Sequence, residues 1–354
     1  MTTTPQIANS LTAGKLPTAA PWAMLAGSIA VFVIGAYILE GGDLNWIGAV
    51  ILGVIAFVVL NFIIALLVEG RRQATDRLVT SLVTGAFVVA LIPLVWLLVT
   101  VLQYGAATMF NGTFLSSSMR NVVGEGGGSL HAIVGTLERT GIAALISVPI
   151  GLMTAIYLVE YGTGRLARGI TFLVDVMTGI PSIVAGLATY AFFVIIFGEG
   201  VKMGFAGSVA LSILMIPVVV RSSEEILKLV PNELREASYA LGVPKWLTIV
   251  RIVLPTSIAG ITTGVMLSIS RVIGETAPLL IVAGFTTSMN YNPFSERMMS
   301  LPVFVYNQYV SPGTEAQFYI ERAWAGALTL ILIVALLNVI ARVVSHFFSP
   351  KLSR

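Results

Sequence analysis

The chain has 354 residues, of which 56% are hydrophobic and 10% charged, and its mean hydropathy is +0.94. Soluble domains carry about 25% charged residues, so the composition excludes the soluble class and predicts an all-α polytopic membrane protein. The formal net charge of +3 bears on membrane orientation, and we expect no nucleic-acid partner. Without cysteine there is no disulfide and no thiol ligand, and the two histidines are too far apart in sequence to indicate a metal site.

A transmembrane helix needs about 20 apolar residues, and eight stretches of the sequence are candidates. They are Trp22–Leu39, Leu44–Val68, Val79–Gln103, Gly141–Leu158, Thr171–Phe197, Phe205–Val220, Thr256–Gly284 and Trp324–Phe347. The first lacks a small-residue cleavage pattern and is predicted to be a retained span. Residues 1–70 are therefore predicted to form a tail and two appended spans with a tight outer hairpin at Glu40–Asp43. Residues 71–354 are predicted to form a six-span core.

Basic residues in short loops predict the orientation, because they concentrate on the cytoplasmic side of a membrane. The segments after the second, fourth, sixth and eighth spans contain Arg71, Arg72, Arg77, Arg165, Arg168, Lys228, Arg235, Lys245, Arg251, Arg342, Lys351 and Arg354. All of them fall on one side if both termini are cytoplasmic. We therefore predict a multi-pass membrane protein in contact with lipid, with both termini inside. Two long outer segments, 104–140 and 285–322, are candidates to meet an external partner.

The longest markedly charged stretch, residues 221–255, lies between the sixth and seventh spans. Pro231 is predicted to separate two short helices, Gly242 to end the second, and Pro244 to start the next. A charged helix–glycine–helix element between two apolar spans is not membrane core. We expect another protein to bind it.

The spacing within this stretch carries a resemblance. It places Glu236-Ala237-Ser238 before Gly242, and Ile252 two residues before Leu254-Pro255. This resembles the EAA signature of ABC importer membrane subunits, with Ser238 in place of an alanine.

The resemblance implies that an ATPase docks on this coupling loop through a cytoplasmic coupling helix. Arg235 and Glu236 would pair with ATPase charges, Ala237 and Ser238 would let the helix enter a groove, and Gly242 would make the turn. The alternative is an ordinary amphipathic cytoplasmic loop.

Nucleotide-binding motifs are missing from the sequence, which has no GxxxxGK[ST] pattern. If ATP drives the protein, a partner ATPase must use the ATP and magnesium, and we expect this chain to bind no cofactor. The chain itself would then be a transporter membrane subunit and not an enzyme.

Three further stretches narrow the family. They are the sequences AIYLVEY at 155–161, GIPSIVAGL at 179–187 and RVIGETAPLL at 271–280. Together with the coupling loop they resemble the PstA-type permease subunits of phosphate-specific ABC importers, from about Leu130 to the C-terminus. The resemblance implies a place in the bacterial cell membrane and four partner chains: a PstC-like permease, two PstB-like ATPase subunits and a PstS-like phosphate-binding protein. The first two spans lie outside the family pattern.

Arg271 and Glu275 are four residues apart within the predicted span Thr256–Gly284, so they would share one helix face. A charge at mid-bilayer costs about 2.5–3.5 kcal/mol even on the lenient scale, so the pair must face protein or water. Gly274 and Pro278 indicate a locally irregular helix, which is tolerated where it lines a cavity.

One interpretation of these residues is a phosphate pathway. Arg271 would give phosphate a transient guanidinium contact, Thr276 would add a polar group, and Glu275 would orient Arg271 and neutralise it when the pathway is empty. The alternative is an ion pair that only fixes helix packing or the contact with a partner permease.

Two charged residues lie near the inner ends of spans. Arg221 could pass the anion to the cytoplasm, or it could be a positive-inside anchor. Asp175 would repel phosphate, so we interpret it as a structural partner of a cation or a backbone group.

Residues in or near the fourth and fifth spans are predicted to be structural. Pro149 and Pro181 would kink those spans. Glu138 and Arg139 would lie at a span entrance, solvated or facing headgroups, and His131 would be a surface histidine.

The sequence therefore predicts the permease subunit of an ATP-driven phosphate importer, which forms half of a translocation pathway. One alternative keeps the class and changes the substrate to sulfate, molybdate or another oxyanion, since a guanidinium does not separate tetrahedral anions. A second alternative is a transporter without an ATPase, against which the coupling loop argues.

Overall fold

The structure is a computed structural model that describes residues 14–39 and 45–348. Within these ranges every regular element is a helix. Seven helices are long and apolar enough to cross a membrane. The bent helix pair Gly164–Thr178 and Ser182–Phe197 would add an eighth span if the two helices together are counted as one span. The prediction of an all-α polytopic membrane protein is confirmed.

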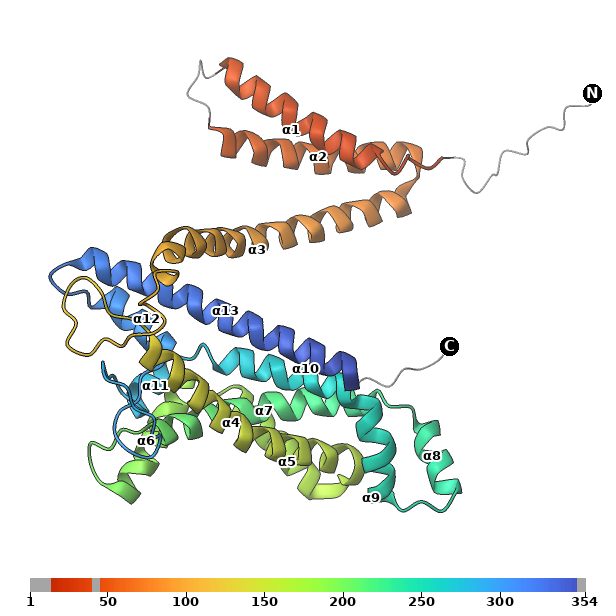
Figure 1. Cartoon of the computed structure of the whole chain (residues 1–354). Coiled ribbons are helices and arrows are strands. Elements are labelled where there is room, and N and C mark those ends of the chain that lie inside the picture. The colour runs from red at the N-terminus through yellow and green to blue at the C-terminus, as the bar shows by residue number, and fades with distance from the viewer. Residues whose placement is uncertain (1–13, 40–44, 349–354) are drawn as a thin grey trace, which may run out of the picture. The chain divides into compact units, whose positions relative to one another are not determined.

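Figure 1 shows the order of the helices along the chain. They are α1 (Ala20–Leu39), α2 (Trp46–Val68), α3 (Arg71–Met109), α4 (Leu130–Ile156), η1 (Tyr157–Tyr161), α5 (Gly164–Thr178), α6 (Ser182–Phe197), α7 (Gly204–Lys228), α8 (Asn232–Ala240), α9 (Lys245–Thr248), η2 (Ile249–Val253), α10 (Leu254–Val272), α11 (Ala277–Val282), α12 (Leu301–Val310) and α13 (Ala316–Phe348). The elements η1 and η2 are π-helical turns.

The packing divides the chain into two units, with the boundary inside α3 between Leu98 and Val99. In the first unit α1 packs along α2, and a Cβ added at Gly53 would lie 2.8 Å from Ile29 Cα. Such close backbone approach is typical of helix pairs in membranes. The predicted hairpin at Glu40–Asp43 lies outside the described residues. The predicted domain boundary after residue 70 coincides with the start of α3 and stays a prediction.

The polar end of the first unit is held by one carboxylate. Arg77 donates from Nε and Nη2 to Glu69, at 2.6 and 2.8 Å, and the Leu16 N–H donates to Glu69 Oε1 at 2.7 Å. The Glu69 side chain is only 2% exposed. The hydrogen bond from Arg77 holds the pKa of Glu69 below its ordinary value of 4.5.

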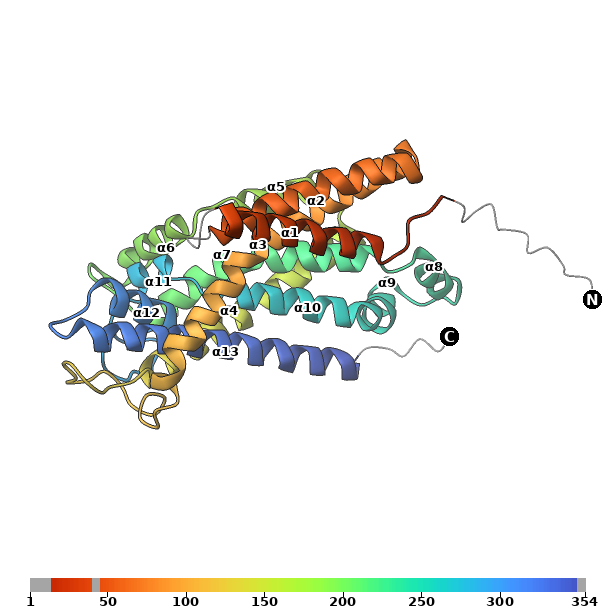
Figure 2. The ribbon, with the colours of Figure 1, turned by 90° about the horizontal axis from the view of Figure 1, so that it is seen from above.

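In the second unit α4, α7, α10 and α13 run side by side in both views (Figures 1 and 2). The α4–α7 contact uses small residues: a Cβ added at Gly151 would lie 2.7 Å from Val219 Cγ1. The Ser147 hydroxyl donates to the Ser212 carbonyl at 3.3 Å across the same contact. Small residues permit this approach, as expected for helices that associate in lipid.

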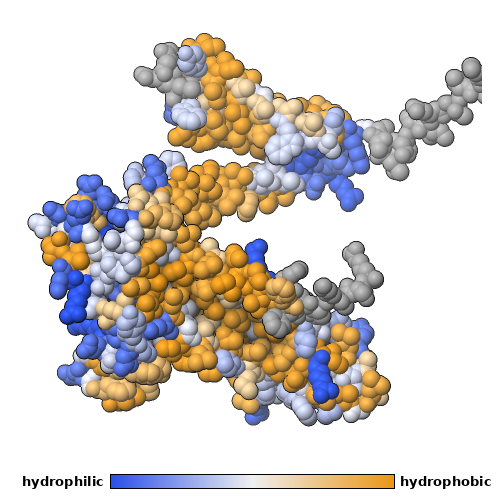
Figure 3. Space-filling model, viewed as in Figure 1, coloured by the Kyte–Doolittle hydropathy of each residue, from blue (hydrophilic) through white to orange (hydrophobic). Residues whose placement is uncertain are grey.

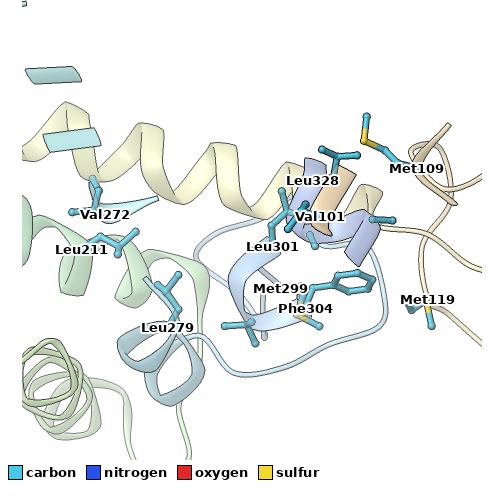
Figure 4. Close-up of a cluster of buried hydrophobic side chains, with 14 of the residues drawn as sticks. Val101, Met109, Met119, Leu211, Val272, Leu279, Met299, Leu301, Phe304 and Leu328 are labelled. Atoms are coloured by element: carbon cyan, nitrogen blue, oxygen red, sulfur yellow. The ribbon is translucent and has the colours of Figure 1, made fainter. Parts of the chain in front are cut away.

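A buried apolar cluster joins the helices of the second unit (Figure 4). Its members include Val101 of α3, Leu211 of α7, Val272 of α10, Leu279 of α11, Phe304 of α12 and Leu328 of α13. Apolar side chains also cover the sides of this unit, while polar ones gather over the end that holds α12 and the outer segments (Figure 3).

The fourth span begins earlier than predicted, at Leu130 instead of Gly141. Arg139 and His131 lie in this added part of the helix and are 1% and 2% exposed. Their predicted positions, at a headgroup entrance and on the surface, are therefore wrong. They are buried because residues distant in sequence cover this part of α4: the Leu301 N–H donates to Thr136 at 2.8 Å, and Phe304 packs edge-on against His131.

The two segments predicted to lie outside, 104–140 and 285–322, are tied together by Arg322, which is 2% exposed. Its Nη1 donates to the carbonyls of Gly124 and Gly126 at 2.6 and 2.9 Å, and its Nε donates to Gln308 at 3.0 Å. The glycine-rich part of the first outer segment is therefore anchored to α12 and α13.

Two predicted spans are broken. The fifth bends by 108° between α5 and α6, and Pro181 stands at the N-cap position of α6, so the predicted kink is a full break. Pro149 lies inside the continuous helix α4, where a kink stays a prediction. The seventh span ends as α10 at Val272 and resumes as α11 at Ala277.

The two breaks are supported by one close contact, which yields a prediction. A Cβ added at Gly186 of α6 would lie 2.7 Å from Pro278 Cα at the start of α11. We expect Gly186→Ala to destabilise the protein by about 1–3 kcal/mol through overpacking. The measurement is the thermal unfolding midpoint of the detergent-solubilised protein.

Gly141→Ala in α4 is the matched control, because a Cβ there meets nothing within 4 Å. It should leave the midpoint unchanged or raise it slightly, since alanine is the better helix former. Equal midpoints for the two variants would contradict the close contact between α6 and α11.

Glu69 yields a prediction on pH. Because its folded pKa is depressed, the stabilisation from Glu69 is present above its unfolded pKa and is lost as the pH falls through the folded pKa. We expect Glu69→Gln to speed amide hydrogen exchange around residues 70–77 equally from pH 7 down to about 4.5, and this effect should fade as the pH drops further, through the folded pKa. Asp76→Asn, at an exposed position in the same helix, is the control. A loss of the Glu69→Gln effect well above pH 4.5 would contradict the lowered pKa.

Candidate functional site

Residues Asn232–Thr248 form an elbow made of α8, a turn and α9. Pro231 stands at the N-cap position of α8, and Gly242 has φ +76°, a left-handed conformation that favours glycine. The hydroxyls of Ser238 and Thr248 hydrogen-bond at 2.8 Å and close the angle between the two helices. The predicted breaks at Pro231 and Gly242 are confirmed.

The elbow presents a mixed polar and apolar surface. Glu236, Ala237 and Gly242 are exposed. Leu241 and Trp246, which sequence reasoning did not single out, are 83% and 61% exposed. Their only sequence signal is that large apolar residues stand in an otherwise polar loop. Such a patch is typical of a protein-binding surface.

Ser238 faces the inside of the elbow and not the solvent. Its residue is 3% exposed, and its hydroxyl is used by Thr248. The small side chain of Ser238 therefore lets α8 pack on α9. The resemblance to the EAA signature did not predict this role.

Arg235 is engaged within the chain. Its Nε and Nη2 donate to Glu160 Oε1 at 3.0 and 2.9 Å. Its Nη1 donates to the Val230 carbonyl at 2.6 Å, and its Nη2 also donates to the Leu227 carbonyl at 3.1 Å. The side chains of Arg235 and Glu160 are 13% and 4% exposed. The prediction that Arg235 is available to pair with another protein's charges is corrected, because its donors are used here.

The break between α10 and α11 holds the second group of candidate residues. Arg271 is exposed in the last turn of α10, Glu275 lies in the break, and Thr276 occupies the N-cap position of α11. Because the helix ends at Val272, Arg271 and Glu275 do not share a continuous helix face, and no ion pair joins these two described residues. The predicted orientation of Arg271 by Glu275 is therefore corrected.

The residue that precedes Arg271 is tied to α13. Ser270 accepts a hydrogen bond from Asn338 Nδ2 of α13 at 3.1 Å. A cation at the interrupted end of a membrane helix, with no ion-pair partner among residues 14–39 and 45–348, can bind an anion without first breaking an ion pair.

Arg221 differs from Arg271, because carboxylates surround it. It forms an ion pair with Asp175 of α5 and donates to Glu224 at 2.9 Å, and Lys228 donates to the other Glu224 oxygen at 2.7 Å. Asp175 is thus the structural partner of a cation, as the sequence suggested. Arg221 links α5 to α7, and its charge is compensated.

The structure shows no candidate metal site among residues 14–39 and 45–348, where no group of three or more histidine or carboxylate side chains could hold an ion.

The candidate site consists of an exposed elbow at one end of the second unit and a broken span whose Arg271 has no ion-pair partner in the described part of the chain. In both views the elbow lies at the end opposite α11 and α12 (Figures 1 and 2). An all-helical membrane domain with these two features has the architecture of a transport permease.

Comparison with known proteins gives the family. Residues 147–354 match the model of the binding-protein-dependent transport system inner membrane component. The chain is 49% identical over 276 residues to the phosphate transport system permease protein PstA 1 of Mycobacterium tuberculosis, covering 77% of this chain and 90% of that protein. It is 40% identical over 285 residues to PstA of Pasteurella multocida, covering 79% and 96%. The chain therefore belongs to the binding-protein-dependent transport system inner membrane components, in the group of the PstA permeases.

Solved structures share the fold. An inward-facing MetNI methionine ABC transporter chain matches with a TM-score of 0.52 at 20% identity, covering 62% of this chain and 96% of that chain. A chain of a bacterial ABC transporter that imports alginate matches with a TM-score of 0.52 at 12% identity, covering 78% and 97%. The six-span permease core predicted from the sequence is thus an ABC importer fold.

Proposed function

We propose that this chain is the permease subunit of an ATP-driven importer of inorganic phosphate. The observation that carries the proposal is the 49% identity, over 77% of this chain, to a relative named as a phosphate transport permease. The chain forms half of the translocation pathway, and a separate ATPase drives it through the elbow. ATP and magnesium belong to that ATPase.

The pathway is proposed to pass the break between α10 and α11. Exposed Arg271 offers planar donors that match phosphate oxygens, and Thr276 adds a hydroxyl at the same break. Glu275, four residues after Arg271 and directly after the exposed Gly274, limits how tightly the anion is held, because it places a negative charge near the same route. Arg221 is a weaker candidate, since an incoming phosphate would compete there with Asp175 and Glu224.

The partners follow from the same proposal. A PstC-like permease supplies the other half of the pathway, two PstB-like ATPase subunits bind the elbows, and a PstS-like protein delivers phosphate to the outer segments. Both termini of this chain then lie in the cytoplasm, on the side of the elbow and of the basic loops.

Arg271 yields the test of the pathway. In proteoliposomes with the full importer and phosphate-loaded binding protein, Arg271→Ala should lower phosphate uptake about 10- to 100-fold. That range corresponds to the loss of a charge-assisted hydrogen bond. Arg271→Lys should keep part of the activity, because it retains the charge without the planar fork.

Arg342→Ala is the matched control, as Arg342 is an exposed arginine near the end of α13 without an ion-pair partner among the described residues. Unchanged uptake by Arg271→Ala would exclude the proposed pathway. Competition with sulfate and molybdate tests the substrate: uptake that either anion inhibits as strongly as unlabelled phosphate would favour another oxyanion. Transport without any ATPase would exclude the proposal.

Glu236 yields the test of ATPase docking. Glu236→Ala should reduce the amount of ATPase that co-purifies with the permease several-fold, because an exposed ion pair contributes about 0.2–1 kcal/mol. Gly242→Val should reduce it more, since φ +76° is strained for a β-branched residue and the turn must change.

Glu225→Ala is the control for both variants, because Glu225 is exposed on α7 outside the elbow. ATPase retention equal to the wild type in both elbow variants would show that the ATPase binds elsewhere.

A further inference from the structure

Both helices of the elbow are tied to the same short segment, η1, which ends α4. From α8, Arg235 reaches the Glu160 carboxylate with two nitrogens, at 3.0 and 2.9 Å. From α9, the Lys245 ammonium donates to the Glu160 carbonyl and lies 4.9 Å from the centroid of the Tyr161 ring. Glu160 is therefore contacted through its side chain by one helix of the elbow and through its backbone by the other.

These contacts are distant in sequence. The Arg235–Glu160 pair spans 75 residues and the Lys245–Glu160 contact spans 85. The chain joins the elbow directly to α7 and, through η2, to α10, whereas these contacts tie it to the end of α4, which is distant in sequence. The clip between Ser238 and Thr248 makes α8 and α9 one body, so a displacement of either helix acts on Glu160.

The segments on either side of the elbow are both π-helical. The turn η1 (Tyr157–Tyr161) ends α4, and the turn η2 (Ile249–Val253) begins α10. A π-turn departs from the regular hydrogen-bond ladder of an α-helix and often marks a functional site. These turns are the places where α4 and α10 can adjust as the elbow moves.

We propose that Glu160 is a positioning residue that passes the movement of the elbow to α4. The inference rests on the proposed function, because it takes the elbow to be the ATPase docking site. α4 packs closely on α7 and also contacts α10, so a pull on η1 moves α4 together with the helices that the chain connects directly to the elbow. Without the Glu160 contact, the ATPase would still bind the elbow but would move α4 less.

The carboxylate can be tested separately from the packing. Glu160→Gln keeps the shape and one acceptor oxygen and removes the charge that Arg235 binds. We expect the amount of co-purified ATPase and the thermal unfolding midpoint to stay near those of the wild type. The phosphate imported per ATP hydrolysed should fall about tenfold, the effect of losing a charge-assisted contact in the moving part.

Glu160→Asp places the charge one methylene short of Arg235 and should give an intermediate ratio. Glu225→Gln, which changes an exposed glutamate outside this contact, is the matched control and should leave the ratio unchanged. A wild-type ratio in Glu160→Gln would overturn the inference. So would a loss of uptake that only follows a loss of assembled complex.

A covalent replacement of the contact covers the case in which Glu160→Gln does not assemble. The chain has no cysteine, so a Glu160→Cys, Arg235→Cys double variant would carry the only two thiols. A short bifunctional thiol cross-linker should restore the phosphate-to-ATP ratio that the uncross-linked variant lacks, and the reagent should not affect the wild type. A cross-linked variant that remains uncoupled would overturn the inference.

The failure of the proposed function is distinguishable from these outcomes. If the wild-type permease binds no ATPase or imports no phosphate, the proposed function is wrong. If the wild type couples and the Glu160 variants couple equally well, only the role of Glu160 is wrong.

Discussion

The contact between α4 and α7 is the constraint on which the second unit depends. Gly151 lets the two helices approach until Val219 fills the space that a side chain would take. The hydroxyls of Ser147 and Ser212 donate to carbonyls of the facing helix at 3.3 and 3.5 Å. In lipid there is no hydrophobic drive to bring helices together, so small residues and such hydrogen bonds must do it. The Leu130 end of α4 then meets α12, and its other end, at η1, meets the elbow.

Local signals in the sequence were sufficient for the elbow but not for its contacts. Pro231 and Gly242 determine backbone conformation at their own positions, so the breaks could be read from the sequence alone. The engagement of Arg235 could not, because Glu160 lies 75 residues away and its sequence context is an apolar span end. The Tyr157–Tyr161 stretch indicated the family by resemblance, but it did not predict that Glu160 pairs with Arg235.

The membrane spans show the same limit in another form. Hydropathy placed the spans but not the start of α4, because residues 130–140 are polar enough to resemble a loop. They are helical since α12 and the segment before it cover them, and that cover is a contact over 165 residues. At the other break, Gly274 and Pro278 indicated irregularity, yet helical spacing still paired Arg271 with Glu275. A helix that ends at Val272 removes the basis of that pairing.

The arginines of the second unit show why charge alone does not define a pathway. Arg139 is 1% exposed, and only its Nε has a partner, the Gly135 carbonyl at 2.9 Å. Arg221 is compensated by Asp175 and Glu224. Arg271 is exposed and makes no ion pair within the described part of the chain, so it is the one of these three that is both accessible and uncompensated.

The choice of arginine at position 235 follows from the number of acceptors that converge there. The Glu160 carboxylate and the carbonyls of Leu227 and Val230 lie around one guanidinium, which donates to all three from a rigid planar fork. A lysine ammonium has three donors at one point and cannot span them at these distances. Lys245, by contrast, meets a single carbonyl and the face of Tyr161, which suits a point charge. The fork at Arg235 joins the end of α7, the start of α8 and the end of α4, so a rotation of α8 about α7 must either carry η1 with it or break an ion pair whose carboxylate is 4% exposed. Because displacing one partner would leave a nearly buried carboxylate without its cation, moving α4 with the elbow is the less costly response.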